Sequence, residues 1–83
     1  MMKYALTAPL TSKTVSNQFK QLAKLIATSS TLMLDLSEVA NIDSAGLALL
    51  VELKNLAQGK QCKLSFHKSE IVERLCQLYK IIL

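Results

Sequence analysis

Residues 31–59 read TLMLDLSEVANIDSAGLALLVELKNLAQG, and this stretch decides the fold. The opening run from Thr31 to Leu36 is short and almost continuously apolar, which predicts a strand buried on both faces at the centre of a partly parallel sheet. A loop follows, and residues 44–58 then contain no proline and are rich in leucine and alanine, both strong helix formers. Gly59 stands where a helix C-terminal glycine belongs.

The flanking sequence repeats this alternation of strands and helices. Short strands are expected at residues 3–7 and 62–66, and Thr11 or Ser12 is expected to cap a helix running from Lys13. The apolar residues of the outer helices recur at helical spacing: Val15, Phe19, Leu22 and Ile26 in the first, and Ile71, Leu75, Leu78 and Ile82 in the last, which Ser69 opens. This order requires right-handed crossovers, so the sequence predicts one α/β domain over residues 1–83 with helices packed on a mainly parallel sheet.

Composition favours a folded, cytoplasmic protein. Of the 83 residues, 51% are hydrophobic and 19% are charged, which is the balance of a globular chain rather than a disordered one. The N-terminal residues lack the apolar core of a signal peptide, and no stretch approaches the apolar length that a membrane span needs. We therefore expect the chain in the cytoplasm.

Charge and residue types argue against nucleic-acid binding and against catalysis. The formal net charge of +4 comes from dispersed lysines, with Arg74 the only arginine, whereas nucleic-acid surfaces cluster basic and aromatic residues. His67 is the only histidine, and it lacks the companion groups that acid–base catalysis or metal binding requires. Cys62 and Cys76 lack metal-ligand spacing and are expected to be buried free thiols. We expect no enzyme activity, no metal and no cofactor.

The loop from Leu34 to Leu47 concentrates acidic, hydroxyl and glycine residues at the C-terminal end of the central strand. In parallel sheets, ligands and partners meet the chain at such loops. Asp43 precedes the helix and is expected to accept hydrogen bonds from its free N–H groups. Ser44 then lies in the first turn with its hydroxyl facing solvent. A phosphoryl group on Ser44 would gain from the helix macrodipole, although Asp43 would repel it.

Gly46 is an unusual residue inside a helix, where it costs up to about 1 kcal/mol relative to alanine. We expect close approach of another backbone or element there, or tight packing on the protein's own sheet. A helical wheel places one stripe toward the core, and it contains Gly46, Leu49, Leu50, Leu53, Leu56 and Ala57.

Leu47 and Val51 fall outside this stripe, and two interpretations are open for them. They form an apolar docking strip beside Ser44 and Ala48, or they make a second core contact. The docking interpretation predicts that Leu47→Asp weakens a complex by several kcal/mol and leaves the fold intact.

Two segments resemble the signature of the STAS domain family, the anti-sigma-factor-antagonist fold: Leu-Asp-Leu-Ser at residues 34–37 and Asp-Ser-Ala-Gly-Leu-Ala-Leu-Leu at residues 43–50. The order of strands and helices agrees with that family over nearly the whole chain. The resemblance implies a mixed, mainly parallel sheet and a loop-to-helix turn that binds a protein partner. In the sigma-regulating branch, a partner kinase phosphorylates the serine of this turn, here Ser44, and so breaks the complex.

A second, MlaB-like branch comprises small cytoplasmic subunits of the Mla-type phospholipid ABC transporter of Gram-negative bacteria, which bind the ATPase and support its activity through the same turn. Ala48 makes the chain more similar to this branch, because the sigma-regulating branch usually has a second glycine directly after Gly-Leu. The transporter branch often has threonine at the position of Ser44. The serine of this chain keeps the hydroxyl of that threonine but lacks its methyl group.

The resemblance therefore implies a non-catalytic STAS subunit that binds and supports the transporter ATPase and helps to maintain outer-membrane lipid asymmetry. It implies a location peripheral to the inner membrane through the transporter complex. The residues expected to bind the partner are Asp43, Ser44, Ala45, Gly46, Leu47, Ala48 and Val51. The alternative is an anti-sigma factor antagonist, whose partner is an anti-sigma factor kinase and which is controlled by phosphorylation of Ser44.

Overall fold

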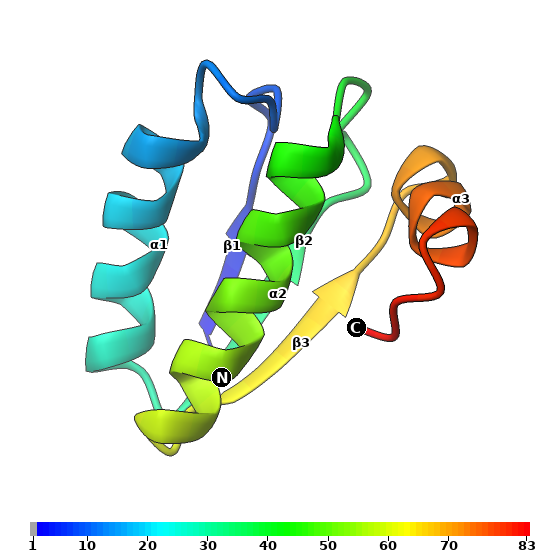
Figure 1. Cartoon of the computed structure of the whole chain (residues 1–83). Coiled ribbons are helices and arrows are strands. Elements are labelled where there is room, and N and C mark those ends of the chain that lie inside the picture. Colours follow the sequence, from blue (N-terminus) through cyan, green and yellow to red (C-terminus); the bar gives the residue numbers. More distant parts are fainter. Residues whose placement is uncertain (1) are drawn as a thin grey trace.

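Strands and helices alternate along the chain in the computed structural model, which describes residues 2–83 (Figure 1). The elements are β1 (Met2–Ala5), α1 (Val15–Thr28), β2 (Thr31–Asp35), α2 (Ser44–Gly59), β3 (Lys63–His67) and α3 (Glu70–Leu78). The predicted α/β fold is confirmed. Within residues 2–83, no helix has the length and apolar character that crossing a membrane requires.

The three strands form one parallel sheet in the order β1-β2-β3, so β2 is central, as predicted. In the register, Leu32 pairs with Leu64, and Leu34 pairs with Phe66 on one side and Tyr4 on the other. Side chains two residues apart on a strand point to the same face. These pairs therefore line one face of the sheet.

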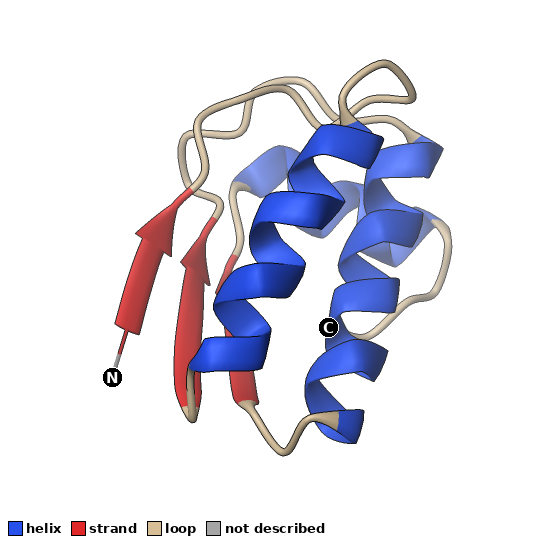
Figure 2. Cartoon of the chain, turned by 90° about the vertical axis from the view of Figure 1, so that its left-hand side faces the viewer, coloured by secondary structure: helices blue, strands red, loops and turns tan. Residues whose placement is uncertain are grey.

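The helices gather on one side of this sheet (Figure 2). Leu32 and Leu34 of β2 are fully buried, whereas Met33, which points to the opposite face, is only half-buried. Alternate residues of β3 are exposed in the same way. The prediction that the central strand is buried on both faces was therefore wrong, because only one face of the sheet is covered by helices.

The core lies between the covered face of the sheet and the helices α1 and α2. Leu22 and Ile26 of α1 and Leu50 of α2 are buried in it. Val15 and Phe19 belong to the same helical stripe as Leu22 and Ile26 but are only half-buried. The N-terminal half of the α1 stripe is therefore partly open to solvent.

The helix α1 begins at Val15 because the residues before it form a turn. The Thr14 hydroxyl accepts a hydrogen bond from the Thr11 N–H (3.0 Å) and donates one to the Pro9 carbonyl (2.6 Å). Thr14 is the residue at the helix start, and its side chain makes no capping bond. The expectation that Thr11 or Ser12 caps this helix was wrong, because Thr14 is the N-cap residue and Thr11 belongs to the turn before it.

The helix α2 ends on a left-handed residue that is not glycine. Gln61 has φ 58°, and the Cys62 N–H donates to the Ala57 carbonyl (2.9 Å), which is the hydrogen bond of a Schellman motif. Gly59 is the last helical residue and does not have a positive φ. The conformational role expected of a terminal glycine thus belongs to Gln61, and α3 ends similarly at Lys80 (φ 56°).

The helix α3 packs through a different face from the predicted one. Its buried residues are Val72 and Cys76, and Cys76, like Cys62, is a buried free thiol, as predicted. The Ser69 hydroxyl accepts a hydrogen bond from the Val72 N–H (3.4 Å) and donates one to the Val39 carbonyl (3.1 Å), which fixes the helix start. The predicted stripe is only partly correct. Leu75 is half-buried and packs against the core, whereas Ile71, Leu78 and Ile82 are exposed, as is Tyr79.

Candidate functional site

The loop between β2 and α2 is held by the loops that follow β1 and β3. Leu10, after β1, donates its N–H to the Asn41 carbonyl (2.9 Å) and accepts a bond from the Asp43 N–H (3.1 Å). On the other side, the Ser69 hydroxyl contacts the Val39 carbonyl. All three loops lie beyond the C-terminal ends of the strands (Figure 1), which is the edge where the sequence predicts the site.

Asp43 caps α2, as predicted, and also ties it to the segment before α1. Its Oδ1 accepts a hydrogen bond from the Gly46 N–H (3.0 Å), and its Oδ2 accepts one from the Ser12 N–H (3.1 Å). The hydrogen bond from Gly46, followed by that from Ser12, lowers the pKa of the Asp43 carboxyl below its ordinary value. Only the bond to Gly46 follows from helix capping, so the sequence gives no sign of the second.

Ser44 lies in the first turn of α2 and is exposed, as predicted. Among residues 2–83, its hydroxyl has no hydrogen-bond partner within the chain. Ala45 is half-buried, and Ala48, one turn further along, is exposed. The start of α2 therefore presents a hydroxyl and two small side chains beside it.

Gly46 is where the β1–α1 loop crosses α2. A Cβ atom at this position would lie 2.8 Å from both the carbonyl carbon and the Cβ of Leu10, and closer still to the Leu10 carbonyl oxygen. The expected close approach of another element is confirmed. The neighbour is the protein's own β1–α1 loop rather than its sheet. The sequence did not indicate that the buried Leu10 would be the contacting residue.

Leu47 does not belong to an exposed docking strip. Its side chain is 2% exposed and lies in the core cluster, and Val51 is half-buried. The helix α2 lies between α1 and α3 (Figure 1), so it is buried over a wider arc than a single stripe. Of the two interpretations of Leu47, the second core contact is correct, and the docking strip that includes Leu47 was wrong.

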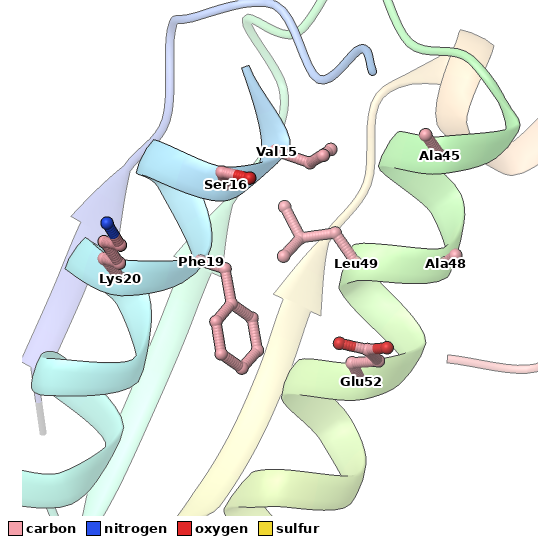
Figure 3. Close-up of a pocket in the computed structure, with 8 residues that line it drawn as sticks. All are labelled: Val15, Ser16, Phe19, Lys20, Ala45, Ala48, Leu49 and Glu52. Carbon is pink, nitrogen blue, oxygen red and sulfur yellow. The ribbon is translucent and has the colours of Figure 1, made fainter. Parts of the chain in front are cut away.

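A groove opens between the N-terminal halves of α1 and α2 (Figure 3). Its volume is about 430 Å³. From α1 it is lined by Val15, Ser16, Phe19 and Lys20, and from α2 by Ala45, Ala48, Leu49 and Glu52. Two of the predicted partner-binding residues, Ala45 and Ala48, thus lie in it. The α1 wall was missed, because which helix faces which is a property of the tertiary structure.

Metal-binding geometry is absent from the described part of the chain. No group of three histidine, cysteine, aspartate or glutamate side chains within residues 2–83 is placed to hold a metal ion. Asp35, another acidic residue near this end of the sheet, accepts a hydrogen bond from the Ser37 N–H (3.0 Å) and lies 3.8 Å from the Lys3 ammonium nitrogen. Its carboxylate is therefore engaged within the chain.

The substitution Asp43→Asn is expected to reduce the acid sensitivity of the fold. The donors that face Asp43 lower its folded-state pKa below the ordinary value of 3.8, so its charge stabilises the fold above that pH, and this contribution is lost as the pH falls through the lower folded-state pKa. Asparagine still accepts the helix N–H but does not titrate.

Urea unfolding midpoints measured from about pH 7 to about pH 3 test this expectation. The difference in unfolding midpoint between the native chain and Asp43→Asn, called the gap below, should be largest near neutral pH and should become smaller in acid. Asp35, whose pKa is lowered chiefly by Ser37, titrates in both proteins, so the gap isolates Asp43. A gap of constant size across the range contradicts the expectation.

Comparison with known proteins identifies the family. A family model described as "Mlab, STAS domain" matches residues 3–81, which include nearly all of β1 and every later element. No curated protein sequence matches the chain. STAS domains mediate protein–protein interactions and are generally non-catalytic. Because the match spans almost the whole sequence, the chain belongs to the STAS domain family and is MlaB-like.

Proposed function

We propose that the chain is a non-catalytic, cytoplasmic subunit that binds and supports the ATPase of a Mla-type phospholipid ABC transporter. Through that complex it lies at the inner membrane and helps to maintain outer-membrane lipid asymmetry. The observation that carries the proposal is the match to the MlaB-like family model over residues 3–81. It is supported by the start of α2, where Ser44 and Ala48 are exposed beside the family turn.

The geometry of this turn suits a docking site. Asp43 accepts hydrogen bonds from two separate segments of the chain, and Leu10 packs against Gly46, so the first turn of α2 has one defined position. A partner that contacts Ser44 meets a surface that needs little ordering on binding, which limits the entropic cost of association. Leu47 contributes by supporting the turn from inside rather than by contact.

An anti-sigma factor antagonist remains the alternative, and the exposed Ser44 hydroxyl favours it. Phosphate on Ser44 would lie at the N-terminus of α2, where the helix macrodipole stabilises negative charge. The same phosphate would add about two negative charges beside the Asp43 carboxylate. In this alternative, phosphorylation by a partner kinase controls binding, whereas the transporter subunit needs no modification.

Affinity purification of the tagged chain from its native cells, followed by mass spectrometry with Ser44 analysed in the same run, separates the two functions. Recovery of an ABC ATPase with membrane components and unmodified Ser44 supports the transporter subunit. Recovery of an ATP-binding kinase with phosphorylated Ser44 supports the alternative. If neither an ABC ATPase nor an ATP-binding kinase is recovered as a specific partner, both proposed functions are overturned.

The variant Ser44→Asp tests the turn itself. A charge placed at a packed contact is expected to lower the affinity for the purified ATPase subunit about tenfold or more. Ser65→Asp is the control, because Ser65 is exposed on the uncovered face of the sheet and carries the same chemical change. Equal binding by both variants would reject a docking role for the start of α2.

A further inference from the structure

The groove between α1 and α2 is continuous with the turn that carries the proposed function. Ala45 follows Ser44 directly and lines the groove, and Ala48 lines it one turn later. On the α1 wall, Phe19 points toward α2. On the α2 wall, Leu49 points toward α1 (Figure 3). A partner that covers Ser44 therefore reaches the groove without leaving the same face of the molecule.

The groove is lined mostly by apolar residues, and the α2 wall includes two small side chains. Phe19 and Val15 are half-buried, so part of each side chain contacts solvent in the groove. Ala45 and Ala48 lie three residues apart on α2, on one face of the helix. Small side chains let another backbone approach closely, and packed helix axes are separated by about 8–10 Å according to the side chains between them.

The backbone chemistry of the walls selects a helical occupant. Both walls are helices, whose N–H and C=O groups are already paired internally. An extended segment buried here would lose hydrogen bonds from its own backbone, since nothing in an apolar groove replaces them. A helix keeps its backbone bonds and offers only side chains. From Ala45 to Glu52 the wall spans about two helical turns, roughly 10 Å.

Opposite charges stand on the two walls. Lys20 lies on the α1 wall and Glu52 on the α2 wall. Within residues 2–83, neither side chain takes part in an ion pair. A helix whose apolar face enters the groove can therefore place an acidic residue beside Lys20 and a basic residue beside Glu52, which fixes its orientation.

We propose that this groove receives an amphipathic helix of the partner ATPase, with an apolar face of about two turns flanked by an acidic residue on one side and a basic residue on the other. The inference rests on the proposed function, because it names the part of that partner which the same surface binds. The half-buried Phe19 and the exposed Ala48 contact the apolar face, and Lys20 and Glu52 set its direction.

The first test fills the groove. Ala48→Trp places a large side chain at an exposed lining position and is expected to weaken binding of the purified ATPase subunit roughly tenfold or more. Gln58→Trp makes a comparable change at an exposed position of α2 outside the groove and should leave affinity unchanged. Circular dichroism of both variants checks that the fold is kept.

The second test identifies the occupant. A photo-cross-linking amino acid at Ser16, another lining position, is irradiated in the complex and the linked partner residues are read by mass spectrometry. Linked residues spaced three or four apart in the ATPase are expected. Linked residues spaced two apart, which indicate an extended segment, or links to a second copy of this chain, would overturn the inference.

The two levels of the proposal fail in different ways. If Ser44→Asp abolishes ATPase binding while Ala48→Trp binds as the native chain does, the groove is not occupied and the proposed function stands. If the native chain does not bind the ATPase, the proposed function fails and the groove proposal fails with it. Charge reversal adds a check: Glu52→Lys should weaken binding several-fold, with a smaller effect at high salt.

Discussion

Replacing Gly46 with alanine is expected to lower the free energy of unfolding by about 3 kcal/mol or more. The added methyl group would lie 2.8 Å from the Leu10 carbonyl carbon, a distance that backbone atoms do not tolerate. Relief requires the β1–α1 loop to move away from α2, which also stretches the hydrogen bond from the Asp43 N–H to Leu10. In a domain this short, stability is modest, so the loss is a large share of the total.

Gly59→Ala is the matched control, because it makes the same change in the same helix. Apart from the neighbouring residues and the backbone of α2 itself, no atom of residues 2–83 lies within 4 Å of the added methyl group. Alanine is also the better helix former, so this variant should gain up to about 1 kcal/mol. Urea denaturation followed by circular dichroism measures both. Equal effects of the two substitutions would show that helix propensity alone, and not contact with Leu10, determines the cost at Gly46.

Leu47→Asp is expected to unfold the chain rather than to weaken a complex. The Leu47 side chain is 2% exposed, and an unpaired carboxylate in that position loses its hydration without gaining a partner. A cost above about 4 kcal/mol follows, since both the apolar packing and the buried charge destabilise the fold. Far-ultraviolet circular dichroism and the loss of a cooperative urea transition are the measurements.

Ala48→Asp provides the comparison for Leu47→Asp. Ala48 is the next residue of the same helix but is exposed, so this variant should keep its stability within about 0.5 kcal/mol and should weaken partner binding instead. A cooperative transition of native stability in Leu47→Asp would restore the interpretation in which Leu47 lies on the docking surface.

Local chemistry made much of this fold predictable. The strand at 31–35, the helix at 44–59 and the Asp43 cap each depend on residues close together in the sequence. The tightness at Gly46 was also predictable, because a helical glycine without a local reason indicates a close neighbour. That the neighbour is Leu10 was not predictable, because it is set by how two distant loops cross.

The errors occurred where two helical faces compete. Apolar residues follow each other at Ile71 and Val72, so α3 has two overlapping stripes, and the one that contains Val72 and Cys76 is buried. Leu47 was misplaced for a related reason, since α2 packs beside both α1 and α3 and is buried around more of its circumference. Which face of α3 is buried, and how far burial extends around α2, depends on the neighbouring elements rather than on the sequence of the helix itself.

The crossing of Leu10 over Gly46 has a mechanical consequence for recognition. Leu10 is hydrogen-bonded through its backbone to Asn41 and Asp43, and the Asp43 carboxylate accepts a hydrogen bond from the Ser12 N–H. A short series of hydrogen bonds therefore connects the segment before α1 to the start of α2. A change in the separation of the two groove walls at this end would therefore stretch or break these hydrogen bonds. In the proposed complex, a partner helix that fits the existing gap binds without this cost, whereas one that needs a wider gap must break these hydrogen bonds.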